Sequence, residues 1–287
     1  MSRRGIVFVL VALALAGSAT LAWWLLRSRE PAYRITFIPG QSVWEHARRL
    51  APLGPGAPDE LIALAADERF ARDELGLDAL VGPARAPRTD GVAATWLEGF
   101  LYPDTYFFPD DVTTRDVVER AARQFVKVWN DLAAAHPDAM RAHAEAGRSP
   151  AALIVLASLV EEETQDPAEA ARIAGVFLNR LDKGMRLETD PTLMYRPDRV
   201  ARAPTPAERR DATNPYNTYK IPGLPPGPIC SPGKGALRAV LAPEQHDYLF
   251  FVARRDGSRQ HAFATTLAEH EANIDRYLRK VTRPPEP

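Results

Sequence analysis

Hydrophobic and polar positions divide the chain into one long apolar run, a short alternating segment and several stretches with helical spacing. Residues 5–26 carry no charge, and as a helix this run would span about 33 Å, close to the roughly 30 Å of a bilayer core. Arginines flank the run, and Trp23 and Trp24 lie near its end, where an interfacial aromatic belt is found. We therefore expect an uncleaved anchor with residues 1–4 in the cytoplasm; a signal peptide cleaved after Ala16 is the alternative.

The pattern beyond the run predicts strands as well as helices. Alternation over Tyr33–Ile38 predicts a strand, and two alternating segments around Asp256-Gly257 predict a hairpin. Apolar residues recur at helical spacing elsewhere. One expected helix follows Ser42. The others cover residues 60–75, 114–128, 132–147 with a break near Pro137, and 266–279. Together these elements predict an α+β fold.

The strongest helix signal lies in the middle of the chain. Ser149-Pro150 provides an N-cap and an N1 proline, and Ala151–Val160 is apolar almost all round, which predicts a buried helix. Three glutamates, Glu161 to Glu163, follow. A capping box from Asp166 to Glu169 is then expected to open a second helix that Gly184 ends. The long proline-rich segment from Asp190 to Gly235 exceeds an ordinary connection, and loops of that size are usually functional.

Composition narrows the classes of function. Of the 287 residues 46% are hydrophobic, enough for a substantial core, and a formal net charge of −1 provides no basic field for nucleic acid. The single Cys230 cannot form an internal disulfide, and the six histidines show no pair at metal-ligand spacing. We therefore expect neither a metal nor a cofactor.

Glu161 is the first candidate for chemistry. At 100° per residue it extends the apolar stripe formed by Leu153 and Ala157, so its carboxyl should be partly desolvated. Desolvation and the neighbouring glutamates should raise the pKa of Glu161, as suits a general acid that protonates a glycosidic oxygen. The alternative is that the three glutamates form an ordinary solvated helix end.

Three motifs then resemble one family. They are LASLVEEET at residues 156–164, VFLNRLDKGMRLETDPTLMY at 176–195 and NPYNTYKIPGLPPGPICSPG at 214–233. Their order and spacing resemble those of the MltG-type (YceG-like) endolytic murein transglycosylases. LEGFLYPDTYFF at residues 97–108 is similar to the opening of that family's catalytic region, and residues 33–50 are similar to its degenerate LysM-like module.

The resemblance implies domain limits and a reaction. It implies an anchor at residues 5–26, a LysM-like module at 27–90, a mostly helical catalytic domain with short strands at 91–283 and a tail at 284–287. The implied enzyme lies in the inner membrane with its catalytic domain in the periplasm. It cuts MurNAc–GlcNAc bonds inside nascent peptidoglycan strands, leaves 1,6-anhydro-MurNAc ends and works beside glycan synthases.

The resemblance also implies residue roles. Glu161 corresponds to the family's catalytic glutamate, and Glu163, Tyr216, Asn217 and Tyr219 would bind the glycan. Two functions of other classes stay open. One is an anchored peptidoglycan-binding protein without catalysis. The other is a serine acyl enzyme built on the S-x-x-K pattern from Ser231, which Pro-Gly between the two residues disfavours.

Overall fold

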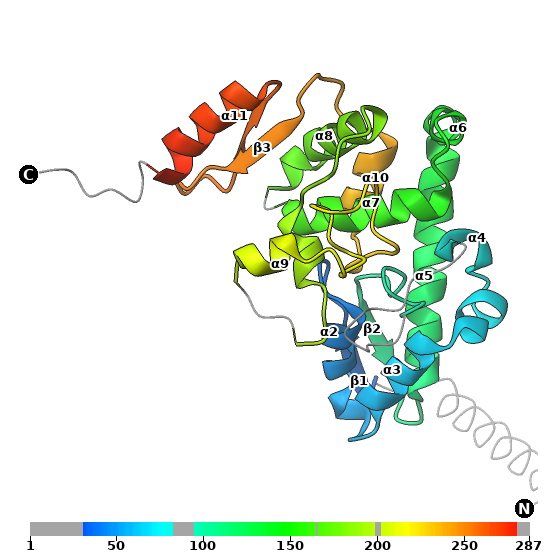
Figure 1. Cartoon of the computed structure of the whole chain (residues 1–287). Coiled ribbons are helices and arrows are strands. Elements are labelled where there is room, and N and C mark those ends of the chain that lie inside the picture. The colour runs from blue at the N-terminus through cyan, green and yellow to red at the C-terminus, as the bar shows by residue number, and fades with distance from the viewer. Residues whose placement is uncertain (1–30, 83–94, 165, 199–201, 280–287) are drawn as a thin grey trace, which may run out of the picture.

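The computed structural model describes residues 31–82, 95–164, 166–198 and 202–279 (Figure 1). Helices and two small sheets make a mixed fold, in agreement with the expected α+β class. Within those residues no helix combines the length and the apolar character needed to cross a bilayer. The expected anchor at residues 5–26 lies outside the described residues.

The first sheet joins two segments that are far apart in the sequence. Strand β1 (Tyr33–Thr36) pairs antiparallel with β2 (Thr105–Phe108), with Tyr33 opposite Phe108 and Thr36 opposite Thr105. Between them lie the helices α2 (Val43–Arg48), α3 (Ala57–Ala66) and α4 (Asp78–Val81), with a 3-10 turn η1 (Ala51–Leu53) and a π turn η2 (Phe70–Glu74). The stretch expected as one helix over residues 60–75 is therefore divided. The partner strand comes from beyond residue 90, and the domain limits stay a prediction.

Two neighbouring helices confirm the expected break at Pro137. Helix α5 (Thr114–Ala135) begins at the Thr113 cap and runs further than its predicted end, because apolar residues continue to Leu132. Helix α6 (Pro137–Glu145) begins at the proline. α5 contacts both α3 and the later helix α10 (Lys234–Leu241), so it links the N-terminal elements to the rest of the chain (Figure 1).

The core is continuous across the expected module boundary. It includes Ile35 and Phe37 from the first strand and its turn, and Phe100 and Phe125, whose rings meet edge to face at 5.1 Å. Each fully buried phenylalanine of this kind contributes about 1.5–3 kcal/mol of transfer free energy. The N-terminal elements and the helical region therefore share one hydrophobic interior.

Helix α7 (Pro150–Glu163) crosses the centre of the molecule (Figure 1). Every residue from Leu153 to Val160 is buried, as its apolar sequence predicts, and α7 contacts α4, α8 (Ala170–Asp182) and α10. A buried helix can expose polar groups only at its ends. The three glutamates therefore occupy the single C-terminal turn where α7 leaves the core.

Asp166 is an N-cap followed by Pro167, as expected, but the expected capping box with Glu169 is wrong. Asp166 accepts a hydrogen bond from the Ala168 N–H and opens a 3-10 turn, η3 (Pro167–Glu169), before α8. The Glu169 carboxylate instead accepts hydrogen bonds from the backbone N–H of His261 at 3.0 Å and from its ring Nδ1 at 2.9 Å. A tertiary partner 92 positions away has displaced the local cap.

The C-terminal part confirms the predicted hairpin. Strands β3 (Phe250–Ala253) and β4 (His261–Ala264) pair antiparallel, and Thr266 caps α11 (Leu267–Ile274), which a π turn η5 (Asp275–Arg279) extends. In its described residues before α10, the long proline-rich segment contains a 3-10 turn η4 (Asp190–Met194) and the short helix α9 (Pro206–Arg210). The hairpin and α11 lie at one edge of the molecule, beside α8 (Figure 1).

Candidate active site

Glu161 lies against a segment from the far end of the proline-rich loop. Its Oε2 accepts a hydrogen bond of 3.0 Å from the backbone N–H of Gly233, the N-cap residue of α10. The side chain is partly buried. Burial raises the pKa of Glu161, the negative charge of Glu162 adds to the rise, and the Gly233 hydrogen bond opposes it. The shift has the direction expected from the sequence.

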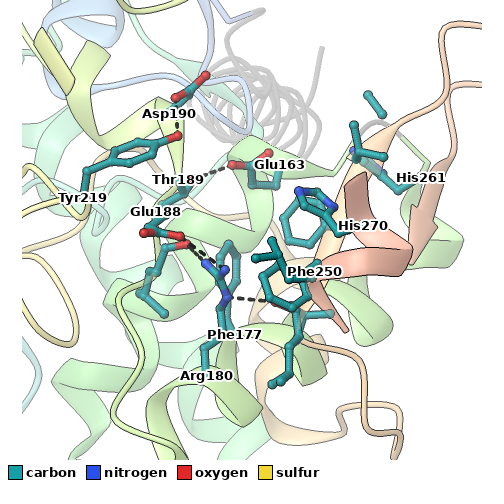
Figure 2. A pocket seen from close by; sticks show the side chains of 17 residues that line it. Glu163, Phe177, Arg180, Glu188, Thr189, Asp190, Tyr219, Phe250, His261 and His270 are labelled. Atoms are coloured by element: carbon teal, nitrogen blue, oxygen red, sulfur yellow. Dashed lines mark hydrogen bonds and ion pairs between the residues drawn. The ribbon is translucent and has the colours of Figure 1, made fainter. Parts of the chain in front are cut away.

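Glu163 faces a different space. Two residues along an α-helix correspond to about 200° of rotation, so Glu161 and Glu163 leave α7 on nearly opposite sides. The Thr189 hydroxyl donates a hydrogen bond to Glu163 Oε1 (Figure 2). Burial raises the pKa of Glu163 to about 7, against the lowering effect of that hydrogen bond and with help from the nearby Asp190. Near neutral pH the Glu163 carboxyl therefore exists in both protonation states.

Glu163 lines a cavity of about 410 Å³. Its walls come from α7, α8, the β3–β4 hairpin and the start of the proline-rich segment (Figure 2). Aromatic side chains provide the apolar surface, among them Phe177, Phe250 and Phe251. A mostly apolar wall with a few convergent polar groups is typical of a small-molecule or sugar site.

Arg180 provides a fixed positive charge at the cavity wall. Its guanidinium donates to the backbone carbonyls of Leu249 at 2.8 Å and Leu187 at 2.7 Å, and an ion pair of 3.4 Å joins it to Glu188. The residue is 7% exposed. Because backbone carbonyls hold the guanidinium on two sides, the charge cannot swing away from the cavity.

His270 is another polar residue that lines the cavity. Its ring stacks on Phe250 with centroids 5.1 Å apart, and its Nδ1 is buried with no hydrogen-bond partner among the described residues. Burial, followed by the charge of Arg180, lowers the pKa of His270. The imidazole therefore offers an unused nitrogen without adding positive charge.

The Tyr216 to Tyr219 run is divided between the cavity and the loop interior. Tyr219 lines the cavity, and its hydroxyl donates a 2.7 Å hydrogen bond to Asp190 (Figure 2). Asn217 is 0% exposed. Its amide nitrogen donates to the carbonyls of Glu208, Arg209 and Asp211, and its Oδ1 accepts from the Tyr219 N–H at 3.0 Å. In this structure Asn217 holds the loop around α9.

Tyr216 is buried with its ring 4.9 Å from that of Tyr195. The structure therefore brings Glu163 and Tyr219 to one cavity, and leaves Tyr216 and Asn217 in the loop interior. Their expected roles in glycan binding stay predictions.

Ser231 and Lys234 do not form an acyl-enzyme pair. Ser231 is buried before α10 begins, and its Oγ has no hydrogen-bond partner among the described residues. Among all the residues that the structure describes, no group of three or more histidine, cysteine or acidic side chains could hold a metal ion.

Comparison with known proteins supplies the family. The model of the YceG-like family matches residues 15–276. The chain belongs to the YceG-like family. A solved YceG-like protein of Listeria monocytogenes has a similar structure, with a TM-score of 0.70 and 28% sequence identity over 86% of this chain and 77% of that one.

Two curated relatives of this YceG-like chain are named endolytic murein transglycosylase. The protein of Bacillus subtilis strain 168 is 32% identical over 259 residues, which are 86% of this chain and 66% of the relative. The protein of Streptococcus pneumoniae serotype 2 is 28% identical over 196 residues, 67% of this chain and 34% of the relative. The chain thus spans between about a third and two thirds of these relatives' lengths.

Sequence reasoning missed several residues of the YceG-like site. Arg180 stands in the motif at residues 176–195 without a pattern that marks it as lining a cavity, and a lone histidine after a hairpin, such as His270, is an ordinary surface residue. Gly233 stood in a recognised motif, but its backbone N–H is visible only in the fold. Thr189 likewise reaches Glu163 only through the packing of the loop on α7.

Proposed function

We propose that this YceG-like chain is an endolytic murein transglycosylase. It cleaves MurNAc–GlcNAc bonds within nascent peptidoglycan strands and leaves 1,6-anhydro-MurNAc ends, which terminates strand elongation. The observation that carries the proposal is Glu161, a glutamate of raised pKa at the end of a buried helix in a YceG-like chain. The curated relatives named for this activity support the same reaction.

One carboxyl group can perform both proton transfers. Neutral Glu161 donates its proton to the glycosidic oxygen while the bond from that oxygen to C1 of MurNAc breaks. The resulting carboxylate then accepts the proton of the MurNAc C6 hydroxyl as its oxygen bonds to C1. The proton returns to Glu161, no water is consumed, and the product carries the 1,6-anhydro ring. Because the nucleophile belongs to the substrate, the reaction needs no second carboxylate to activate water.

The cavity beside Glu163 is proposed to hold a sugar unit next to the bond that is cut. Tyr219 offers a ring face for a pyranose, and Arg180 offers a fixed cation for a carboxylate or carbonyl oxygen. Below its pKa of about 7, Glu163 can donate a hydrogen bond to an acetamido carbonyl. These features support a polar sugar substrate that carries acidic branches.

The proposed location follows from the start of the chain. Residues 5–26 would anchor the protein in the inner membrane, with the N-terminus in the cytoplasm and the catalytic region in the periplasm beside glycan synthases. The proposed LysM-like module at residues 27–90 would contain β1 and the helices α2, α3 and α4, and the partner strand of β1 comes from residues 105–108.

The test is mass spectrometry of muropeptides released from uncrosslinked glycan strands by the wild type and by Glu161→Gln. We expect internal cuts with 1,6-anhydro-MurNAc ends from the wild type and none from the variant. Reducing ends would mean that water is the nucleophile and the chain a hydrolase. Absence of cleavage by both proteins, with glycan binding retained, would favour a non-catalytic binding protein.

A further inference from the structure

A backbone clamp surrounds Glu161. The segment Ile229–Gly233 lies along the last turns of α7: the Ile229 N–H donates to Ser158 Oγ at 3.1 Å, and the Cys230 thiol donates to the Ser158 carbonyl at 3.3 Å. Further along, the Gly233 N–H donates to Glu161 Oε2 at 3.0 Å. Three successive contacts therefore fix this segment against the helix that carries the glutamate.

The turn after β1 holds the other side of the same segment. The Gly40 N–H donates to the Ser231 carbonyl at 3.1 Å, and the Ser231 N–H donates to the Gln41 carbonyl at 2.9 Å. A Cβ on Gly233 would lie 3.5 Å from Glu161 Oε2 and 3.6 Å from the Pro39 side chain, so both the carboxyl and the turn lie next to Gly233.

The turn is itself fixed in the core. Gly40 has φ +76, a conformation that favours glycine, and the next helix α2 begins at Ser42 with a capping box. The buried Glu98 accepts the N–H of Val43 with both carboxylate oxygens, at 3.2 and 3.1 Å. The N-terminal elements can therefore transmit a fixed position to the Ser231 backbone.

We propose that the Gly233 N–H is a positioning group for Glu161, held in place by the turn at Pro39–Gln41. This inference rests on the proposed role of Glu161 as the acid. A neutral carboxyl has one hydroxyl oxygen and one carbonyl oxygen. Because Oε2 accepts the Gly233 N–H, the proton resides on Oε1, and the donor thereby selects the oxygen that delivers it.

The same hydrogen bond limits how strongly Glu161 retains its proton. A donor at Oε2 stabilises the carboxylate, and the positive end of α10, which begins at the next residue, acts in the same direction. Glu162 is the charged neighbour that opposes them. Glu161 must be neutral for the first step and ionised for the second, so the donor assists the second step.

Gly233→Pro removes the donor, and because the proline Cδ takes the place of the N–H hydrogen, the Glu161 carboxyl must also move away. Gly233 has φ −78, close to the value that proline imposes, so the variant loses the N–H at a compatible position. Gly233→Ala is the matched control, because it keeps the N–H and its Cβ meets only ordinary contacts. The full-length chain is assayed with uncrosslinked glycan strands, and kcat and KM are measured from pH 4 to 9.

For Gly233→Pro we expect kcat to fall about 10- to 100-fold, as for a misplaced catalytic group, with KM within about twofold of the wild type. Activity should be lost at a higher pH than in the wild type, because removal of the donor raises the pKa of Glu161. Gly233→Ala should keep the wild-type pH profile. Equal profiles and equal kcat for the two variants would overturn the proposal.

A second pair of variants tests the turn independently. Gly40→Ala strains a φ of +76 in the clamp, and Gly147→Ala strains a φ of +72 at the end of α6, with open space around it. Both should lose similar stability, and only Gly40→Ala should lower kcat and move the pH profile. The same response from both would overturn the role of the turn, even if Gly233→Pro does not fold.

Glu161→Gln separates this inference from the proposed function. If that variant keeps cleaving strands, Glu161 is not the acid and the proposed function fails at that residue. If Glu161→Gln is inactive while Gly233→Pro behaves as Gly233→Ala, the acid assignment stands and the positioning role alone is refuted.

Discussion

Glu163→Gln should change how the stability of the chain depends on pH. The folded protein holds the pKa of Glu163 at about 7, and the reference value for an unperturbed glutamate is 4.5. Between these values the unfolded chain has released the proton and the folded chain retains it. The free energy of unfolding therefore falls as pH rises from 4.5 to 7, and below 4.5 this loss is absent.

The size of the effect follows from the shift. The difference between 7 and 4.5 is 2.5 pKa units, and each unit corresponds to about 1.36 kcal/mol, so ionised Glu163 costs the folded state about 3 kcal/mol above pH 7. Between pH 5 and pH 8 the change is about 2.5 kcal/mol. Glutamine has the same shape and does not ionise, so the variant should lack this loss.

The assay is urea unfolding of the full-length wild type and Glu163→Gln at pH 5 and pH 8, followed by tryptophan fluorescence. Other titrating groups act equally in both proteins, so the difference between them isolates Glu163. We expect the variant to gain about 2 to 3 kcal/mol on the wild type as pH rises from 5 to 8. A difference that stays constant with pH would refute the reasoning.

Thr189→Val provides a variant of opposite sign. The Thr189 hydroxyl donates to Glu163 and lowers the pKa of that carboxyl. Valine removes the donor at nearly constant volume, so the pKa of Glu163 should rise further and the loss of stability should extend to higher pH. A Thr189→Val protein with the wild-type pH dependence would show that the hydroxyl does not act on Glu163.

Three further substitutions test other parts of the fold. His46 is buried, its two ring nitrogens have no partner among the described residues, and its pKa is lowered to about 3. The wild type should therefore lose stability as pH falls below 6.5, because the unfolded chain binds a proton that the folded chain does not. His46→Leu should lack this loss, which thermal unfolding at pH 4 can measure. Asn217→Ala should cost about 2–3 kcal/mol in urea unfolding, because three backbone carbonyls lose their donor. Gly99 has φ +87, and a Cβ added there would lie 2.6 Å from the Pro228 Cβ. The unfolding temperature of Gly99→Ala should therefore fall further than that of Gly147→Ala, whose Cβ meets open space.

Local signals predicted the helices that matter most for the site. The start and the burial of α7 follow from Ser149-Pro150 and the apolar run after it. An N-cap, an N1 proline and all-round hydrophobicity each depend only on residues of the same helix. The position of Glu161 at the helix end and the upward direction of its pKa follow from the same run. Sequence reasoning succeeded where the determining groups are neighbours in the chain.

Long-range partners set what the sequence did not predict. The capping box at Asp166 was wrong because Glu169 finds His261, and a buried carboxylate gains more from a charge-assisted pair than from a cap at a solvated helix start. The cavity combines residues of α7, α8, the hairpin and the loop. These residues are far apart in the sequence, and no spacing between them predicts that they line one cavity. The raised pKa of Glu163 therefore required the fold.

The clamp around Glu161 also orders events during synthesis. β1 cannot pair until β2 is made, 69 to 75 positions later. Glu161 has no Gly233 N–H to accept until the chain has grown 72 residues beyond Glu161. A chain that is made from its N-terminus therefore has Glu161 without this hydrogen bond until most of the chain is complete. Unfinished or stalled chains would carry Glu161 without the Gly233 N–H that holds its carboxyl.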